Sequence, residues 1–335
     1  MIVRSLAPNS ARIKELLPLV ARSNSAADLI IYTQQAEDYF LLKVLGQQFY
    51  DEFDAFLSMP NVPLSPIQTK LIGHIEKAVA NCAMVAMLKD GNVLITDSGT
   101  AEITGSNAMP ARQWAVIAAI ENASKKADDY LESLTAFLFS NANATELATW
   151  KESNPFTRTA PILLKTASDF SIACNREIRW HLFQSCFLDI QDSQDESIGT
   201  AFGFEFLDTL LAWTGAETPD PPLTPRQLAA ISFAKRAVAT ATLAKVLPRQ
   251  LFQIDNSGIR TFYTSDGIST KNMATPEEAD RYCALLREES GKALYNLKNL
   301  VKGAPEQFTS YTPASAAYKS NITSSPNGSS IMFRA

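Results

Sequence analysis

The stretch LSPIQTKLIGHIEKAVA, residues 64–80, decides the fold, because the chain repeats it about 159 residues later as LTPRQLAAISFAKRAVA, residues 223–239. Seven of the seventeen aligned positions are identical, whereas unrelated segments of this length share roughly one. The identical pairs are Leu64/Leu223, Pro66/Pro225, Gln68/Gln227, Ile72/Ile231, Ala78/Ala237, Val79/Val238 and Ala80/Ala239. Self-similarity at a fixed spacing indicates that one structural unit occurs twice in this chain.

Both repeated segments begin with the signature of a helix N-terminus. Residues 65–68 read Ser-Pro-Ile-Gln and residues 224–227 read Thr-Pro-Arg-Gln. The hydroxyl accepts from a free backbone N–H, the Gln reaches back to the cap, and Pro suits the first helical position. The sequence therefore predicts two long helices, which run to near Leu88 and near Leu247.

Alternating sequence follows each of these helices and predicts β-hairpins at residues 92–104 and 250–265. Their turns read Asp97-Ser98-Gly99 and Asn256-Ser257-Gly258, and such residues tolerate the positive φ of tight turns. The hairpins can be ordinary surface turns or projecting contact arms, since exposed strand edges are docking templates. On the second alternative, these six tip residues are candidate interface residues.

The remaining pattern completes a mainly α fold, a tandem duplication of a helical-bundle domain. A long helix closes each copy, at about 110–139 and from Thr275 onward, and helices at about 168–190 and 197–213 precede the second repeated segment. The predicted organisation is a first repeat (1–140), a linker (141–167), a second repeat (168–302) and an extended C-terminal tail (303–335).

The tail from residue 303 to 335 is rich in Ser, Thr, Ala, Asn and Pro, a composition typical of segments that bury little apolar surface. Its last apolar group is Ile331-Met332-Phe333. We expect these three residues to anchor the tail on a partner or on a neighbouring copy.

Composition excludes several classes of protein. With 335 residues, 46% apolar content and a net charge of −5, the chain can bury substantial cores but lacks the basic excess of a broad nucleic-acid footprint. No run of 18 apolar residues predicts a membrane span, and the N-terminus lacks the apolar core of a signal peptide. The four scattered cysteines, Cys82, Cys174, Cys186 and Cys283, predict buried thiols rather than a zinc site.

The residues that usually carry chemistry are scarce. The only two histidines are His74, which we expect to be half-buried in packing, and His181, for which no Asp–Ser or Cys partner is evident. The sequence also lacks the nucleotide-binding and hydrolase motifs. It therefore predicts no catalytic residue, no cofactor and no metal.

Two clusters have alternative interpretations. The acidic run Asp189, Asp192, Asp195 and Glu196 predicts a solvated turn between helices, with a weak divalent-ion site as the alternative. The aromatic residues of the second half have helical spacing, which favours a core over a stacking platform for nucleic acid. The members of this aromatic set are Trp180, Phe183, Phe187, Phe202, Phe204, Phe206 and Trp213.

The order of these elements resembles an uncharacterised family of Bacteroidetes phage and prophage proteins over about residues 27–335. The resemblance rests on helices that end in LGQQFYDEF (45–53), the capped long helix, the DSG hairpin, the closing helix, and a second unit introduced by KTASDF (165–170). That family in turn resembles the small helical head–tail connector (adaptor) proteins of tailed phages. The resemblance implies a structural virion protein that rings the portal beneath the capsid, and it implies no catalytic residues.

On this resemblance we expect a ring of about twelve copies, with the portal protein and tail or further neck proteins as partners. Genomic DNA would pass through without specific binding, and no membrane would be involved. The protein would be made in the bacterial host cytoplasm and reside in the virion, at the head–tail interface. The alternatives are a tail-completion protein, a non-virion helical interaction scaffold, and an enzyme with a site between the repeats, which the scarcity of histidine disfavours.

Overall fold

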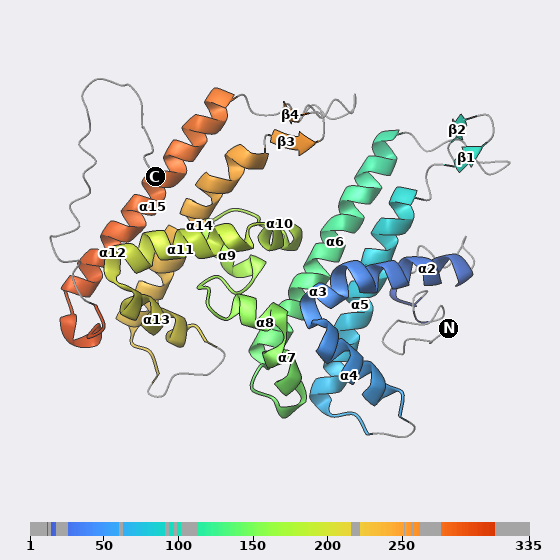
Figure 1. Ribbon diagram of the computed structural model, residues 1–335, viewed down its shortest axis with the longest axis horizontal. Coiled ribbons are helices and arrows are strands. Elements are labelled where there is room, and N and C mark those ends of the chain that lie inside the picture. The colour runs from blue at the N-terminus through green and yellow to red at the C-terminus, as the bar shows by residue number, and fades with distance from the viewer. Residues whose placement is uncertain are drawn as a thin grey trace.

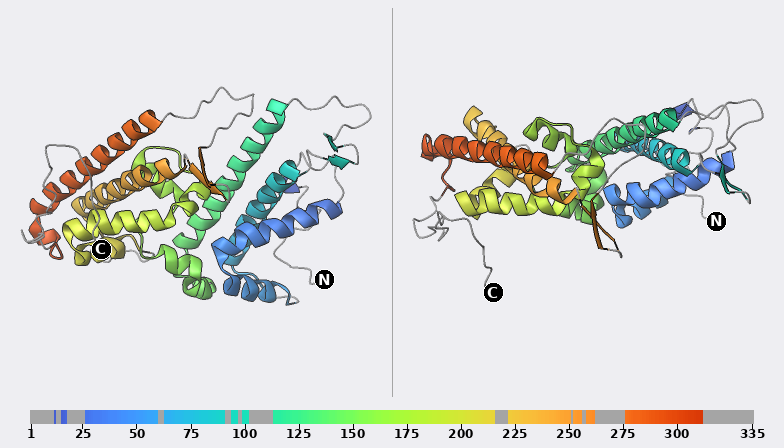
Figure 2. Two further views of the ribbon diagram at one scale, coloured as in Figure 1. Left: turned by 45° about the horizontal axis from the view of Figure 1, so that its top comes forward. Right: turned by 90° about the horizontal axis from the view of Figure 1, so that it is seen from above.

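A computed structural model describes residues 12, 15–17, 26–59, 63–90, 94–96, 99–101, 113–215, 222–250, 252–255, 258–261 and 276–311. These residues form a mainly helical fold in which two bodies lie side by side and a group of short helices lies between them (Figures 1 and 2). The mainly α fold class predicted from the sequence is therefore confirmed.

The first body begins with α2 (Ala26–Ala36), the π-helix η2 (Glu37–Leu41), α3 (Leu42–Leu45) and α4 (Gln47–Leu57), followed by α5 (Pro66–Asp90), β1 (Leu94–Thr96), β2 (Gly99–Ala101) and α6 (Gln113–Ser140). The short helices between the bodies are η3 (Thr145–Leu147), α7 (Ala148–Glu152), α8 (Asn154–Thr159), α9 (Ala167–Cys174) and α10 (Trp180–Ser185). The second body comprises α11 (Phe187–Gln194), the π-helix η4 (Asp195–Gly199), α12 (Thr200–Phe202), α13 (Phe204–Trp213), α14 (Pro225–Gln250), β3 (Phe252–Asp255), β4 (Gly258–Thr261), α15 (Pro276–Lys302) and η5 (Pro305–Gln307).

The predicted capping boxes start both long helices. At α5, the backbone N–H of Ser65 donates to Gln68 Oε1 at 2.9 Å and the N–H of Gln68 donates to Ser65 Oγ at 3.2 Å. At α14, the corresponding distances between Thr224 and Gln227 are 2.8 and 3.3 Å. Two backbone donors are satisfied at each helix start, so a helix begins where the sequence predicted it.

Each body packs its own hydrophobic core around a pair of long helices. In the first, α5 and α6 lie side by side and α2 to α4 cover them (Figure 1). In the second, α14 pairs with α15, and α9, α11 and η4 pack against α14. The small residues of the long helices are deeply buried, for example Ala83 in α5 and Ala237 in α14, both 0% exposed, which lets neighbouring backbones approach closely.

The two bodies share an unusual local feature ahead of their long helices. A π-helix is followed by a short α-helix and then by a glycine with positive φ, Gly46 at φ 76° and Gly203 at φ 96°. A new helix, α4 or α13, starts directly at each glycine. Glycine adopts this backbone conformation without the steric cost that a Cβ would impose.

The segment predicted as a linker, 141–167, is instead part of the folded structure. Trp150 is 1% exposed, and Ile162, Leu163 and Leu164 are each 0% exposed in the core of the second body. Gln194 fixes this extended piece, since its Oε1 accepts from Leu163 N at 2.8 Å. The sequence shows an extended apolar end at residues 161–164, and the structure buries it in the core of the second body.

The helix predicted at about 168–190 is also interrupted. Helix α9 ends where Asn175 adopts the left-handed conformation at φ 53° and Arg176 N bonds to Ser171 O at 3.2 Å. Asparagine tolerates this conformation at a helix end, so the chain turns before α10 and α11. The prediction of one continuous helix was wrong at this point.

Two antiparallel strand pairs connect the long helices. Leu94 pairs with Ala101 in β1–β2, and Phe252 pairs with Thr261 in β3–β4. Both pairs lie beyond the ends of the long helices in Figure 1.

The first part of the predicted tail packs on the second body. Residues 303–311 include η5, and Phe308 is 2% exposed. The ring of Tyr311 lies 6.1 Å from that of Phe206, and Phe308 lies 6.1 Å from Trp213. The extended tail predicted from residue 303 therefore starts no earlier than residue 312, because its first aromatic residues belong to the core.

Within the described residues, one helix, Pro66–Lys89, is long and apolar enough to cross a membrane by length and composition alone. A core helix of a soluble protein passes the same test, and 44% of the most apolar window of this helix is buried inside the fold. Its packing against α2 and α6 accounts for that apolar content.

Candidate functional site

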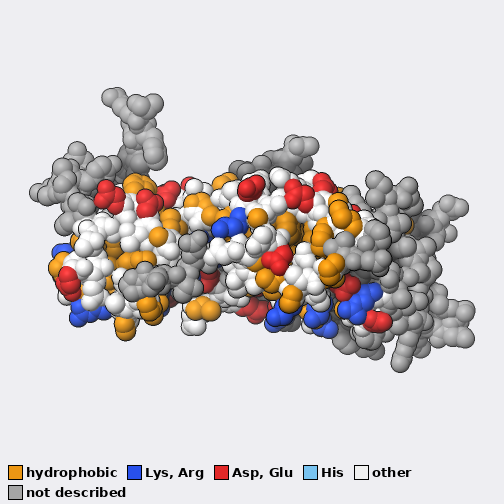
Figure 3. Space-filling view, turned by 90° about the horizontal axis from the view of Figure 1, so that it is seen from below, with side chains coloured by type: hydrophobic (Ala, Val, Ile, Leu, Met, Phe, Trp, Pro, Cys, Tyr) orange, Lys and Arg blue, Asp and Glu red, His pale blue; other side chains and the backbone are white. Residues whose placement is uncertain are grey.

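The surface carries charge of both signs. On the face seen from below, acidic side chains lie mainly along the upper edge and basic side chains mainly along the lower edge, with apolar side chains between them (Figure 3). This face has no broad basic field, in agreement with the absence of a basic excess in the sequence.

The interface residues predicted from the sequence are placed only in part. Gly99 begins β2 and Gly258 begins β4. Asp97, Ser98, Asn256, Ser257, Ile331, Met332 and Phe333 lie outside the described residues. The proposed contact arms and tail anchor therefore stay predictions.

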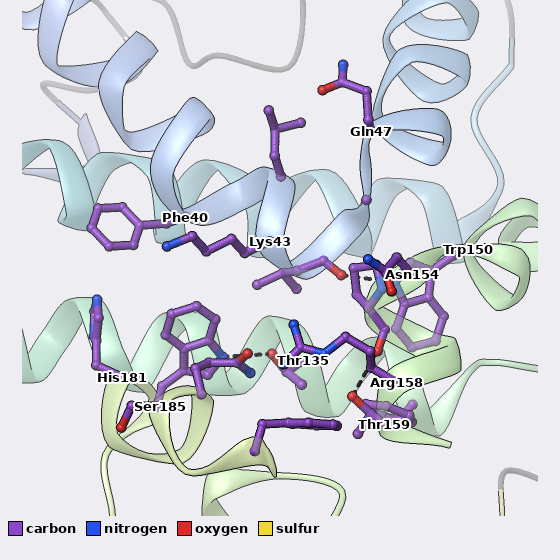
Figure 4. A pocket seen from close by; sticks show the side chains of 18 residues that line it. Phe40, Lys43, Gln47, Thr135, Trp150, Asn154, Arg158, Thr159, His181 and Ser185 are labelled. Atoms are coloured by element: carbon purple, nitrogen blue, oxygen red, sulfur yellow. Dashed lines mark hydrogen bonds between the residues drawn. The ribbon is translucent and has the colours of Figure 1, made fainter. Parts of the chain in front are cut away.

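A pocket of about 660 Å³ lies where the first body meets the short helices (Figure 4). Its walls come from η2, α3, α4, α6, α7, α8, α10 and α11. The residues that line it are Phe40, Leu42, Lys43, Val44, Gly46, Gln47, Thr135, Phe139, Trp150, Asn154, Pro155, Arg158, Thr159, Trp180, His181, Gln184, Ser185 and Phe187. This volume is in the range of small-molecule sites.

Two tryptophans form a fixed part of the pocket wall. Trp150 Nε1 donates to the carbonyl of Val44 at 3.0 Å, and Trp180 Nε1 donates to Thr135 Oγ1 at 3.2 Å. Both side chains are almost fully buried. A buried indole N–H that finds a partner holds its ring in one orientation, so the apolar wall is rigid.

The charged lining of the pocket is cationic. Lys43 lies on the α3 side and Arg158 extends from α8 on the opposite side (Figure 4). The guanidinium carbon of Arg158 lies 4.5 Å from the centre of the Phe187 ring. None of the described lining residues is Asp or Glu.

His181, also in the lining, has a carboxylate partner that the sequence did not reveal. Its Nδ1 contacts Asp128 Oδ1, and Asp128 also accepts from the backbone N–H of His181 at 3.3 Å. Asp128 lies 53 positions earlier, on α6, so only the packing of α10 on α6 brings the two together. The sequence showed no Asp–Ser or Cys partner for His181, and among the described residues the structure supplies the Asp alone.

This His–Asp pair is not completed by a nucleophile among the described residues. Ser185 lines the same pocket one turn further along α10, but its hydroxyl donates to Leu182 O at 2.7 Å. A serine nucleophile needs its hydroxyl hydrogen-bonded to the base. The pair therefore orients the imidazole at the pocket wall.

A second perturbed group lies close by. Lys165 Nζ donates to the carbonyls of Thr159 and Ala160 at the end of α8. Burial lowers the pKa of Lys165 to about 8, and the neighbouring Lys235 acts in the same direction. Asp169, which accepts from Lys165 N and from Lys235 Nζ, opposes this effect through its negative charge. Lys165 therefore caps the C-terminal end of α8 by donating to its free carbonyl groups.

The other histidine packs as predicted. His74 is half-buried, its ring centre lies 4.9 Å from that of Phe137, and its Nδ1 is 3.2 Å from Ser133 Oγ. Burial, and then Lys77, lower the pKa of His74.

The cysteines also match their prediction, since all four are free and buried. Burial raises the pKa of Cys82 to about 12 and that of Cys186 to about 11. Such thiols behave as small apolar side chains rather than as nucleophiles or metal ligands.

The acidic run lies on a helix and not in the turn that was predicted. Helix α11 continues directly into η4, and two of the acids pair with α14: Asp189 with Arg249 at 2.5 Å and Glu196 with Lys245 at 2.7 Å. The described residues contain no group of His, Cys, Asp or Glu that could hold a metal ion.

The aromatic set of the second half is mostly core, as expected. Trp180, Phe183, Phe187, Phe202 and Phe206 are buried, whereas Phe204 is 59% exposed.

Comparison with known families identifies the family to which the chain belongs. A family of unknown function (DUF6712) matches residues 41–160 and 198–321. Because the match covers more than half of the sequence, the protein belongs to this family. No curated protein and no solved structure matches the chain significantly.

Proposed function

We propose that this protein is a structural virion protein, a head–tail connector that forms a ring of about twelve copies, joins the portal to the tail and lines the DNA channel. The observation that carries the proposal is the repeated segment, residues 64–80 and 223–239, whose capping residues start one long helix in each body. Two similar units in one chain suit a protein that makes two similar contacts with its neighbours.

Several features support a tandem duplication as the origin of this doubling. Gly46 and Gly203 are 157 residues apart, each between a π-helix and a new helix. The two family matches begin at residues 41 and 198, at the same spacing. The capped helices α5 and α14 follow in the same order, each leading into a strand pair and a closing helix.

In this proposal the helical bodies form the wall of the ring and the predicted hairpins reach a neighbour or the tail. The tail segment, residues 312–335 with its Ile331-Met332-Phe333 group, anchors on the portal or an adjacent subunit. The mild net negative charge of −5 is compatible with DNA that passes without binding. The location is the head–tail interface of the virion, after synthesis in the bacterial cytoplasm.

A structural role is also favoured over an enzymatic one. The single histidine with a carboxylate partner, among the described residues, has no hydrogen-bonded nucleophile. The perturbed amine of Lys165 is engaged with backbone carbonyls.

The test is assembly. The full chain is purified, and its native mass and negative-stain images are recorded alone and with portal-containing, tail-less particles. We expect a closed ring of about twelve copies, either free or only on the portal. A chain that stays monomeric and does not bind the portal vertex would overturn the proposal.

Two variants locate the anchor. Deletion of residues 312–335 and the triple substitution I331S/M332S/F333S should both leave the circular dichroism spectrum unchanged and abolish the joining of particles. The substitution preserves the length of the tail, so it separates loss of the apolar group from loss of the segment. Normal joining by the triple variant would refute the anchoring role.

A further inference from the structure

We propose that the pocket between the first body and helices α7, α8 and α10 binds a small organic anion with an apolar body. This inference is independent of the connector role, because it rests on the lining of the pocket alone. The pocket combines about 660 Å³ of space with a rigid aromatic wall and cations that have no carboxylate beside them in the lining.

The unbalanced charge is the first argument. Lys43 and Arg158 make no ion pair with any residue that the structure describes, although the chain as a whole carries more acidic than basic groups. The exposed Arg158 side chain lies over the Phe187 ring, and its N–H groups form no hydrogen bond with any residue that the structure describes. Cations held near a low-dielectric wall attract anions more strongly than cations on an open surface do.

The neutral donors are the second argument. The side-chain amides of Asn154 and Gln184 line the pocket and form no hydrogen bond within the described structure. Together with the two cations they offer several donors to an acceptor-rich group such as a carboxylate, sulfonate or phosphate. His181 is held at the same wall by Asp128.

The apolar wall defines the remainder of the ligand. Phe40, Phe139 and Phe187 contribute ring surface, and Trp150 and Trp180 are fixed by their N–H bonds. A flat apolar body is the shape that such a wall accommodates, with the charged group directed toward Lys43 and Arg158. Apolar lining with a few placed polar groups is the usual composition of a small-molecule site.

The test uses two fluorescent probes that differ in one group. These are 8-anilinonaphthalene-1-sulfonate and its uncharged counterpart N-phenyl-1-naphthylamine, titrated into the full-length protein with energy transfer from tryptophan as the readout. We expect one sulfonate probe per chain. The variant K43Q/R158Q should lose about tenfold in affinity for the sulfonate, the effect of one or two charged hydrogen bonds, and bind the neutral probe as before.

Two controls make the result specific. The variant K126Q/K298Q removes the same charge from exposed positions outside the pocket, so it should bind both probes like the unmodified protein. The variant Q184W fills the pocket and should lose both probes. An equal loss of sulfonate binding in the two charge variants, binding that survives Q184W, or no sulfonate binding at all would each overturn the proposal.

Discussion

Substitution of Gly46 and of Gly203 by alanine tests how backbone conformation and close contacts at these two positions contribute to stability. Gly46 and Gly203 have the same place in their bodies and nearly the same backbone, with φ 76° and ψ 148° against φ 96° and ψ 145°. A Cβ on residue 46 would lie 2.9 Å from Ser153 Cβ and 3.2 Å from Pro155 Cδ, whereas a Cβ on residue 203 would meet nothing within 4 Å. The two positions thus share backbone strain but not a steric clash.

The expected losses of unfolding free energy follow from this difference. A residue with a Cβ in this backbone region costs about 1–3 kcal/mol, and the reduced entropy of the unfolded chain returns about 0.4–1 kcal/mol. Gly203→Ala should therefore destabilise by about 1–2 kcal/mol. Gly46→Ala adds overpacking against Ser153 and Pro155, about 1–3 kcal/mol more, for a total of about 2–5 kcal/mol.

The assay is urea-induced unfolding, followed by circular dichroism and by tryptophan fluorescence. Gly73→Ala is the control, because Gly73 lies inside α5 with nothing within 4 Å of its added Cβ. That substitution should stabilise by up to about 1 kcal/mol. Equal losses at residues 46 and 203, or no loss at residue 203, would contradict the reasoning from backbone and contact geometry.

Three further outcomes are expected. Deletion from residue 312 should leave the unfolding free energy unchanged, whereas deletion from residue 303 also removes the buried Phe308 and should cost at least about 3 kcal/mol in urea unfolding. For Lys165, the folded pKa of about 8 lies below the ordinary value of 10.5, so the unfolded chain binds more protons between these values. The unfolding free energy of the unmodified protein, relative to that of K165M, should therefore rise as the pH increases across this window and fall as the pH drops toward 8. Urea unfolding at each pH measures this difference. A difference that does not change with pH would contradict the burial of a charged Lys165. Cys82 and Cys186, with pKa values raised to about 12 and about 11, should resist a thiol reagent at pH 8 until urea is added, and rapid labelling of the folded protein would show that these thiols are accessible.

Local sequence rules predicted the long helices well. The hydroxyl, Pro and Gln at positions 65–68 and 224–227 act within one helical turn, so the capping bonds form whenever the helix does. The same rules failed where a local signal was weak. The extended residues Ile162-Leu163-Leu164 of the predicted linker are buried by contacts far along the chain, which no local rule predicts. Asn175 ends a helix whose apolar spacing continues past it.

The sequence by itself therefore determined the helical class and the helix starts, because these depend on contacts between residues three or four positions apart. The pocket was decided only by tertiary structure. Lys43, Arg158 and the Asp128–His181 pair come from segments far apart in the chain, and no local pattern marks them. They meet because α8 and α10 pack against the first body, a result of the whole buried core and not of any one stretch of sequence.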